Sequence, residues 1–128
     1  MLIVHKNMVP LTHIVLQAFH RFFNQQKFEG PVSVKRVTGV SGACENIDTL
    51  YHVTLDGDDR LLNGRRAFLS QTVQLWLEAH LPDFGPVYSI GPSFRAESKE
   101  DERHLRCFEM CEIEFAGGGA RRPTVAGD

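Results

Sequence analysis

Residues 87–115 place an arginine, an aromatic ring and carboxylates where they could bind a charged ligand. In VYSIGPSFRAESKEDERHLRCFEMCEIEF, apolar residues alternate, give way to a charged run, and then alternate again, which predicts two antiparallel strands joined by a long loop. Successive strand side chains point to opposite faces, so Phe108 and Glu112 share one side. A carboxylate beside an aromatic ring is an unusual core and a reasonable pocket wall. Arg95 offers a planar fork of donors that suits phosphate and carboxylate oxygens.

The same stretch resembles motif 2 of the class II aminoacyl-tRNA synthetases, and most closely the form found in the aspartyl, asparaginyl and lysyl branch. That form is FRAE, a variable loop, RHL, two residues and Phe. The matching residues are Gly91 to Glu97, then Arg103-His104-Leu105, then Phe108 and Glu112. The match in type and order extends over about thirty positions, which makes it specific. Taken singly, a solvated strand end, a charged turn and a core phenylalanine explain these residues at least as well, but jointly they do not.

This resemblance implies ATP-dependent activation of an amino acid as an aminoacyl-adenylate, followed by transfer to tRNA. Adenylate formation needs a bent ATP, with positive charge at the reacting phosphates and a platform for the adenine ring. By the family's motif, Arg95 is the catalytic residue and grips phosphate together with the substrate carboxylate. The other ATP-binding positions of the motif fall on Glu97 for the adenine amino group, Arg103 and His104 for the outer phosphates, and Phe108 for the adenine ring.

Residues 69–79, LSQTVQLWLEA, resemble the family segment that lines the amino-acid pocket. Gln74 matches a glutamine that contacts the substrate ammonium group. Leu77 stands where the aspartyl branch has a lysine, so an aspartate substrate would lack its charge partner in a low-dielectric pocket. Glu78 falls where the asparaginyl branch keeps a glutamate able to accept from an amide. An exposed helix residue is an equally good interpretation of Glu78.

The small-residue loop 38–46 is the predicted lid over that pocket. Its Cys44-Glu45 pair, followed six residues later by Tyr51, resembles the mobile loop of the asparaginyl branch. A surface loop is the alternative interpretation, but with motif 2 downstream we favour a lid that closes over the substrate. Glu45 and Glu112 complete the predicted amino-acid-binding residues.

The rest of the pattern predicts the scaffold as an α+β domain, a partial class II synthetase fold with a mostly antiparallel sheet flanked by helices. We expect a helix over 10–28, strands over 32–37, 50–55 and 66–70, a turn at 56–59, a helix from Thr72 to Leu81 stopped by Pro82, and neighbouring strands over 87–97 and 105–115. The first helix is amphipathic and should pack outside the sheet. Pro92 suits an edge, an end or a bulge of its strand.

A long helix followed by a strand is the layout of motif 1, which builds the dimer interface in the family. The proline of that motif is displaced, because the position six residues after Phe28 holds Val34 and Pro31 lies three residues earlier. The proline thus departs from the motif, and it is the layout of helix and strand from which we predict a homodimer through the 10–28 helix and the following strand. Self-association through the open edge of the last strand is the alternative.

Length, charge and cysteine content limit the classes of protein to which this chain could belong. With 128 residues the chain is about one domain. A formal charge of −2 and a pI near 6.3 provide no overall basic field for nucleic acid. The leading apolar run is too short for a secretory or membrane-spanning segment, and the odd set Cys44, Cys107 and Cys111 suits a reducing compartment, so we expect a cytoplasmic protein. Their spacing is not that of a zinc knuckle, and no metal site is predicted.

The family fold continues past motif 2 with acidic metal ligands, further strands and a motif 3 arginine. Here we predict a partial catalytic domain over 1–115 and a glycine-rich disordered tail over 116–128. ATP is the expected cofactor, and Mg²⁺ is expected only for the complete family site. No anticodon domain is visible, although tRNA remains a possible partner. Three hypotheses stay open: an incomplete asparaginyl-type enzyme, a non-catalytic relic or interaction module, and an asparagine synthetase-like paralogue.

Overall fold

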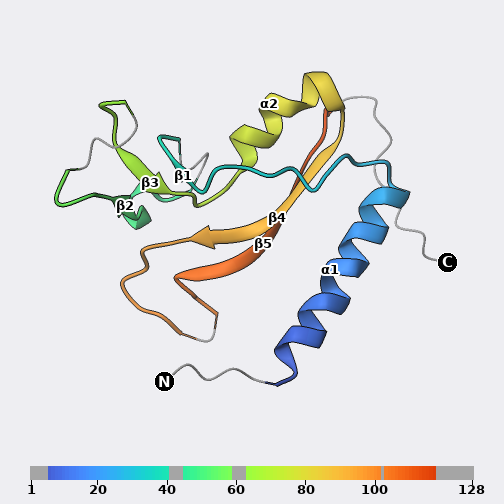
Figure 1. Ribbon diagram of the computed structural model, residues 1–128, viewed down its shortest axis with the longest axis horizontal. Coiled ribbons are helices and arrows are strands. Elements are labelled where there is room, and N and C mark those ends of the chain that lie inside the picture. Colours follow the sequence, from blue (N-terminus) through green and yellow to red (C-terminus); the bar gives the residue numbers. More distant parts are fainter. Residues whose placement is uncertain (1–5, 41–44, 59–62, 102, 118–128) are drawn as a thin grey trace.

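The computed structural model describes residues 6–40, 45–58, 63–101 and 103–117. They form an α+β arrangement, as the sequence predicted (Figure 1). The elements in chain order are α1 (Met8–Gln25), β1 (Val37–Thr38), a 3-10 turn η1 (Ile47–Thr49), β2 (His52–Val53), β3 (Ala67–Leu69), α2 (Gln74–Phe84), β4 (Val87–Phe94) and β5 (Cys107–Glu114). The strands make a small sheet in the order β1-β3-β2 and a longer ribbon of β4 and β5.

The β4–β5 ribbon confirms the predicted pair of strands around the charged loop. The pairing is antiparallel and runs from Val87 opposite Glu114 to Phe94 opposite Cys107. Pro92 lies inside β4 without breaking this ladder. Tyr88 and Phe94 lie an even number of residues from Pro92, so their amides point the same way as its nitrogen. Both amides donate away from β5 to other segments. The donor that Pro92 lacks would therefore also face away from β5, as expected for an edge position.

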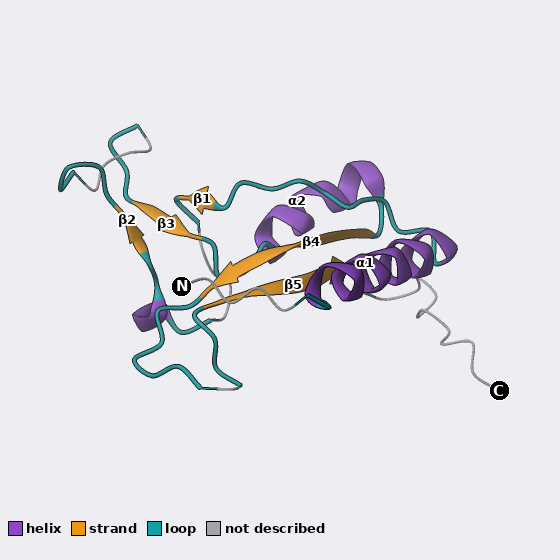
Figure 2. Cartoon of the chain, turned by 60° about the horizontal axis from the view of Figure 1, so that its bottom comes forward, coloured by secondary structure: helices purple, strands orange, loops and turns teal. Residues whose placement is uncertain are grey.

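The two helices cover opposite faces of this ribbon (Figure 2). On one face, Val73 and Leu77 from the start of α2 pack on Val87. On the other, Phe23 and Tyr88 stack with ring centroids 4.3 Å apart. Alternation along β4 explains the division, because neighbouring strand residues point to opposite sides.

Helix α1 packs outside the ribbon, as predicted, but most of its apolar stripe is uncovered. Only Phe23 is buried within the helix. The exposed apolar residues of α1 are Met8, Val9, Leu11, Ile14, Val15, Phe19 and Phe22. A stripe of this size on a single chain is a candidate contact surface.

The strand predicted over 32–37 is wrong, since only Val37–Thr38 forms a strand there. Upstream, the chain follows β4 through isolated bonds, including Val32 N–H to the Tyr88 carbonyl at 2.7 Å. Pro31 has no amide donor to continue a ladder. Gly30 has φ +143, and a Cβ there would lie 2.6 Å from the Tyr88 carbonyl oxygen. At Gly30, a positive φ and close approach to the Tyr88 carbonyl therefore take the place of regular strand pairing with β4.

The prediction that Pro82 stops α2 is also wrong, because the helix continues to Phe84. Pro82 lies in the last turns, where its missing amide removes a single intrahelical bond. The helix ends at Gly85, which has φ 72 and donates its amide to the Leu81 carbonyl at 2.9 Å. At the other end Val73 is the cap residue, although the Thr72 hydroxyl accepts the Gln74 amide at 3.2 Å.

The small sheet is shorter than the sequence suggested, with two or three residues in each strand. The predicted turn after β2 is present, since Leu55 and Asp58 exchange both backbone bonds at 2.9 Å. Positive φ at Asp56 and Gly57 is typical of a tight hairpin turn. Most of the predicted tail, residues 118–128, lies outside the described residues. Neither described helix is long and apolar enough to cross a membrane.

Candidate functional site

The face of the β4–β5 ribbon beneath the start of α2 carries most of the predicted chemistry. Three cross-strand pairs follow one another on it: Ser93 with Phe108, Gly91 with Met110, and Ser89 with Glu112. The β4 members of these pairs are small and buried. Small residues on one strand leave space for side chains and backbone from other segments to approach the sheet.

Glu112 is fixed at the beginning of α2. Its carboxylate accepts a hydrogen bond from the Thr72 hydroxyl and two from the Val73 amide, at 3.1 Å to Oε1 and 3.0 Å to Oε2. A carboxylate beside the first amides of a helix also interacts favourably with the helix dipole. Thr72 and Val73 are thus positioning residues that the sequence reasoning missed. The sequence placed Thr72 at the start of the predicted helix and gave neither residue a role in the site.

The segment before α2 is itself held by buried polar contacts. Ser93 Oγ donates to the Gln71 carbonyl at 2.6 Å, and Ser70 Oγ donates to the Thr72 carbonyl at 2.7 Å. The Gln71 amide group donates to the Thr49 hydroxyl at 2.8 Å. The two serine contacts are buried, and together with the Gln71–Thr49 bond they hold the segment whose donors face Glu112.

The structure brings Arg95 and Phe108 together. Arg95 follows β4, and its amide donates to the Arg106 carbonyl at 2.9 Å. The guanidinium carbon lies 5.8 Å from the centroid of the Phe108 ring, within range of a cation–π contact. Arg95 Nε is buried and has no hydrogen-bond partner among the described residues. A buried donor without a partner is unfavourable unless a ligand or water accepts from it.

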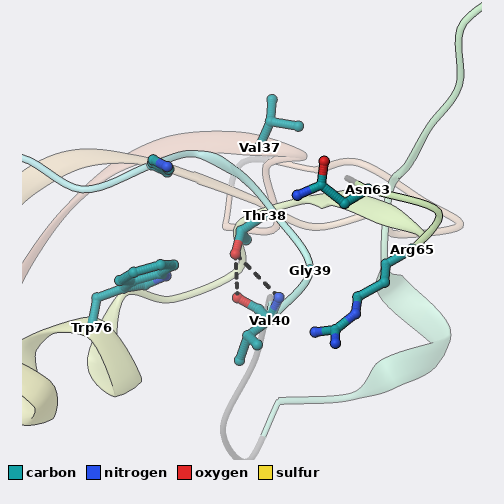
Figure 3. Close-up of a pocket in the computed structure, with 8 residues that line it drawn as sticks. Val37, Thr38, Gly39, Val40, Asn63, Arg65 and Trp76 are labelled. Carbon is teal, nitrogen blue, oxygen red and sulfur yellow. Dashed lines mark hydrogen bonds between the residues drawn. The ribbon is translucent and has the colours of Figure 1, made fainter. Parts of the chain in front are cut away.

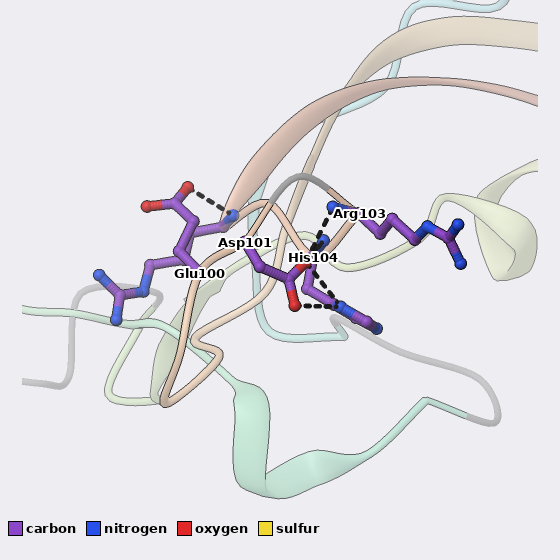
Figure 4. Close-up of polar contacts among 5 residues, drawn as sticks. Glu100, Asp101, Arg103 and His104 are labelled. Atoms are coloured by element: carbon purple, nitrogen blue, oxygen red, sulfur yellow. Dashed lines mark hydrogen bonds and ion pairs between the residues drawn. The ribbon is translucent and has the colours of Figure 1, made fainter.

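The charged loop is organised by Asp101, which the sequence reasoning did not single out (Figure 4). The Asp101 carboxylate accepts from the amides of Arg103 and His104, both at 2.8 Å, and pairs with His104 Nδ1 at 2.9 Å. The Arg103 amide and the His104 contacts hold the pKa of the Asp101 carboxyl below its usual range. Asp, with donors two and three residues later, is a common turn-forming pattern.

The two loop residues predicted to contact the outer phosphates, Arg103 and His104, differ in how their side chains are held. His104 is tied to Asp101, whereas the side chain of Arg103 extends away from that turn (Figure 4). Glu97 is half-buried, and its carbonyl accepts from Arg106 Nε at 2.9 Å. The structure therefore places Arg95 and Phe108 together, and Arg103 and His104 on the adjoining loop.

The predicted amino-acid residues on α2 do not converge on Glu112. Gln74 donates to the Glu78 carboxylate at 3.0 Å along the exposed helix surface. Leu77, between them, is fully buried in the core. Glu45 is half-buried and engaged in an interaction of its own. Its neighbour Cys44 lies outside the described residues.

Arg36 is a further polar residue on this face that sequence reasoning missed. Its guanidinium lies over Gly91, where an added Cβ would collide with Nη2 and lie 3.1 Å from Cζ. Burial lowers the pKa of Arg36, while the charges of Glu112 and Glu109 oppose that effect. The available signal was Gly91 itself, because glycine inside a strand often marks close approach by another group.

A hollow of about 480 Å³ lies away from this face (Figure 3). It is lined by Lys35, Val37, Thr38, Gly39, Val40, Asn63, Arg65 and Trp76. In Figure 3, Trp76 and Arg65 approach it from opposite sides. None of the predicted site residues lines it. We assign the candidate site to the β4–β5 face, because it carries the fixed carboxylate of Glu112 and two arginines with nitrogens that are unpaired among the described residues.

Comparison with known families and proteins agrees with the motif. The family described as tRNA synthetases class II (D, K and N) matches residues 4–120. The asparagine–tRNA ligase of Koribacter versatilis is 39% identical over 105 residues, covering 80% of this chain and 21% of that protein. The corresponding ligase of Sorangium cellulosum is 36% identical over 104 residues, covering 81% and 21%. The chain thus spans about a fifth of the length of these relatives.

Solved structures give the same answer for the fold. The asparaginyl-tRNA synthetase from Pyrococcus horikoshii, complexed with asparaginyl-adenylate, matches with a TM-score of 0.71 and 28% identity, covering 86% of this chain and 23% of that chain. The Entamoeba histolytica asparaginyl-tRNA synthetase, also with asparaginyl-adenylate, has a TM-score of 0.62 at 21% identity, covering 79% and 20%. The second likeness supports the fold alone.

Proposed function

Because the chain belongs to the class II tRNA synthetases of the aspartyl, lysyl and asparaginyl group, we propose that it forms the motif 1 to motif 2 portion of an asparaginyl-type ligase. In this proposal the β4–β5 face binds ATP and an amino acid for adenylate formation. One observation carries it: the Arg95 guanidinium lies against the Phe108 ring, on a sheet face that also holds the fixed carboxylate of Glu112.

Each side chain then has a chemical role in the reaction. A carboxylate oxygen of the amino acid attacks the α-phosphorus of ATP, pyrophosphate leaves, and a mixed anhydride forms. Arg95 binds the carboxylate and the α-phosphate together, so its charge stabilises the negative charge that develops between them. Phe108 stacks under the adenine ring, and Glu97 accepts from the adenine amino group. Glu112 accepts from the substrate ammonium group.

The charged loop supplies the contacts to the outer phosphates. Arg103 extends from the loop without a side-chain partner in the described part of the chain, so it is free to reach a phosphate. His104 is held by Asp101 at 2.9 Å, and this contact orients its ring. The class uses Mg²⁺ with ATP. The described residues form no group of three side chains able to hold a metal ion, and we assign no step to one.

Asparagine is the amino acid that the residues favour. Leu77 is fully buried and apolar, so the position offers no cation to a substrate carboxylate. Gln74 and Glu78 pair with each other at 3.0 Å, and either can exchange that bond for one with a substrate amide or ammonium group. Transfer to tRNA is proposed from the relatives, which are named as asparagine–tRNA ligases. For the same role we propose a cytoplasmic location.

A homodimer through α1 is part of the proposal. The helix presents its apolar stripe to solvent, and a hollow of about 430 Å³ on it is lined by Val15, Ala18, Phe19, Phe22 and Phe23. An apolar stripe with an adjoining hollow suits an identical helix from a second copy. The same surface supports the alternative of an interaction module, which would self-associate without binding nucleotide.

Calorimetric titration with ATP tests the nucleotide site. We expect weak binding by the parent chain and a loss of about tenfold or more in Arg95→Ala and Phe108→Ala, because Arg95 supplies a charge-assisted hydrogen bond and Phe108 a stacking contact, each worth about 1.5 kcal/mol. Arg65→Ala and Phe84→Ala are matched controls, since both residues are exposed and lie off this face. Binding unchanged by both site substitutions would refute the nucleotide site and leave the interaction module.

A further inference from the structure

We propose that Arg36 is a second oxyanion-binding arginine of this site, which contacts the negatively charged group of the ligand between the adenine ring and the ammonium group. The inference rests on the proposed function and adds a residue that lies outside motif 2. Its ligand chemistry is an oxyanion, which the α-phosphate of the nucleotide or the carboxylate of the amino acid can supply.

The position of Arg36 on the sheet carries the inference. Its guanidinium covers Gly91 so closely that a side chain there would collide with it. Gly91 pairs with Met110, midway between the Ser93–Phe108 pair and the Ser89–Glu112 pair. Arg36 therefore lies between the residue proposed to carry the adenine ring and the residue proposed to accept the ammonium group. In an aminoacyl-adenylate, the phosphate and the carboxylate lie between these two ends.

The hydrogen bonds of Arg36 are incomplete in a way that points to a ligand. Its Nη1 is buried and has no partner among the described residues. The nearest acidic group on this face, Glu112, already accepts from the Thr72 hydroxyl and the Val73 amide. Glu109, the other carboxylate whose charge reaches Arg36, lies on the opposite face of β5. A buried guanidinium donor is unfavourable when unpaired, and an oxyanion would satisfy it.

The backbone of Arg36 is fixed, so the guanidinium extends from a stable base. The Ser70 amide donates to the Arg36 carbonyl at 2.9 Å, and the Phe94 amide donates to the Ser70 carbonyl at 3.0 Å. These two bonds connect Arg36 to the end of β4, next to Arg95. Arg95 also has a buried, unpaired nitrogen in the described part of the chain. Two guanidinium groups on one face, each with a nitrogen unpaired among the described residues, can bind an anion together.

The charge of the ligand provides the test. The full chain, Arg36→Met and Arg36→Lys are titrated with adenosine, AMP and asparagine, and affinities are read from amide chemical shifts. Arg36→Met should weaken AMP or asparagine binding about tenfold or more, the usual loss for one charge-assisted hydrogen bond, and leave adenosine unchanged. The ligand that weakens identifies the source of the oxyanion. Arg36→Lys should restore part of the loss, and Arg65→Met should change nothing.

Four other results would overturn the inference. Equal weakening of adenosine, AMP and asparagine would mean that Arg36 only supports the fold. Tighter AMP binding in Arg36→Met would mean that the guanidinium occupies the place of the ligand. No change in any affinity, with Arg95→Ala still weakening AMP, would remove Arg36 from a site that stands. If the parent chain binds none of the three ligands, the proposed nucleotide site fails, and Arg36 loses its role with it.

Discussion

Glu112 offers the sharpest test of how the site is held together. The substitution Glu112→Gln keeps the size of the side chain but removes the charge and turns one acceptor into a donor. In the folded chain the carboxylate accepts from the Thr72 hydroxyl and the Val73 amide. Hydrogen bonds to a charged group contribute about 1.5 to 3 kcal/mol each. Since Glu112 is half-buried and glutamine retains one acceptor, we expect a loss of about 1.5 to 3 kcal/mol in unfolding free energy.

Urea unfolding of a double-mutant cycle measures the contact itself. Thr72→Val removes the hydroxyl donor with little change in shape, so the two substitutions should be non-additive by about 1 kcal/mol, as expected for residues in direct contact. Glu114→Gln is the matched control, because it lies on the same face of β5 and should change the free energy little. Additivity within about 0.3 kcal/mol would refute the reasoning and show that Glu112 is not anchored at α2.

Three further predictions follow from separate features. The pKa of the Asp101 carboxyl should lie below its ordinary 3.8 in a carbon NMR titration. Because the folded pKa is depressed, the stability from the loop contacts is fully present above the ordinary pKa and is lost as the pH falls through the folded pKa. A titration midpoint at or above 3.8 would contradict these contacts. Gly30→Ala should lower the unfolding free energy by about 2 kcal/mol or more, since φ +143 and a crowded strand carbonyl exclude a side chain. Gly57→Ala, at φ +84 with open space, should cost only about 1 kcal/mol in the same unfolding assay, and equal losses would refute the crowding argument. Leu11→Glu and Ile14→Glu should reduce self-association in sedimentation while leaving the unfolding midpoint of dilute protein unchanged, because both side chains are exposed. Unchanged association would exclude α1 as the interface.

The sequence predicted the parts of the fold that local pattern determines. Alternation on both sides of the charged loop was enough to predict the pairing of β4 with β5, because a strand with one buried face has a strict period of two. The turn after Leu55 followed from residues that tolerate positive φ. The order of residues in the motif brought Arg95 to Phe108, since both lie at the same end of one ribbon.

What the sequence did not predict depends on contacts between distant segments. Arg36 contacts Gly91 from a segment more than fifty residues away. The periodicity of apolar residues along a strand or helix does not predict such a long-range contact. The strand expected over 32–37 is reduced to Val37–Thr38, and upstream of it the chain contacts β4 through single bonds such as that from the Val32 amide to the Tyr88 carbonyl. Gln74 and Glu78 were grouped with Glu112 by motif alone, whereas the helix orients them toward each other.

The most direct test of the central claim is to locate ATP on the chain. Amide chemical shifts of the labelled protein, followed during an ATP titration, report which residues lie near the nucleotide. Our account predicts that the largest changes fall on Ser93, Arg95, Phe108 and Met110, on the face of the ribbon beneath α2. Changes that cluster instead around the hollow lined by Arg65 and Trp76, with the β4–β5 face unaffected, would contradict it.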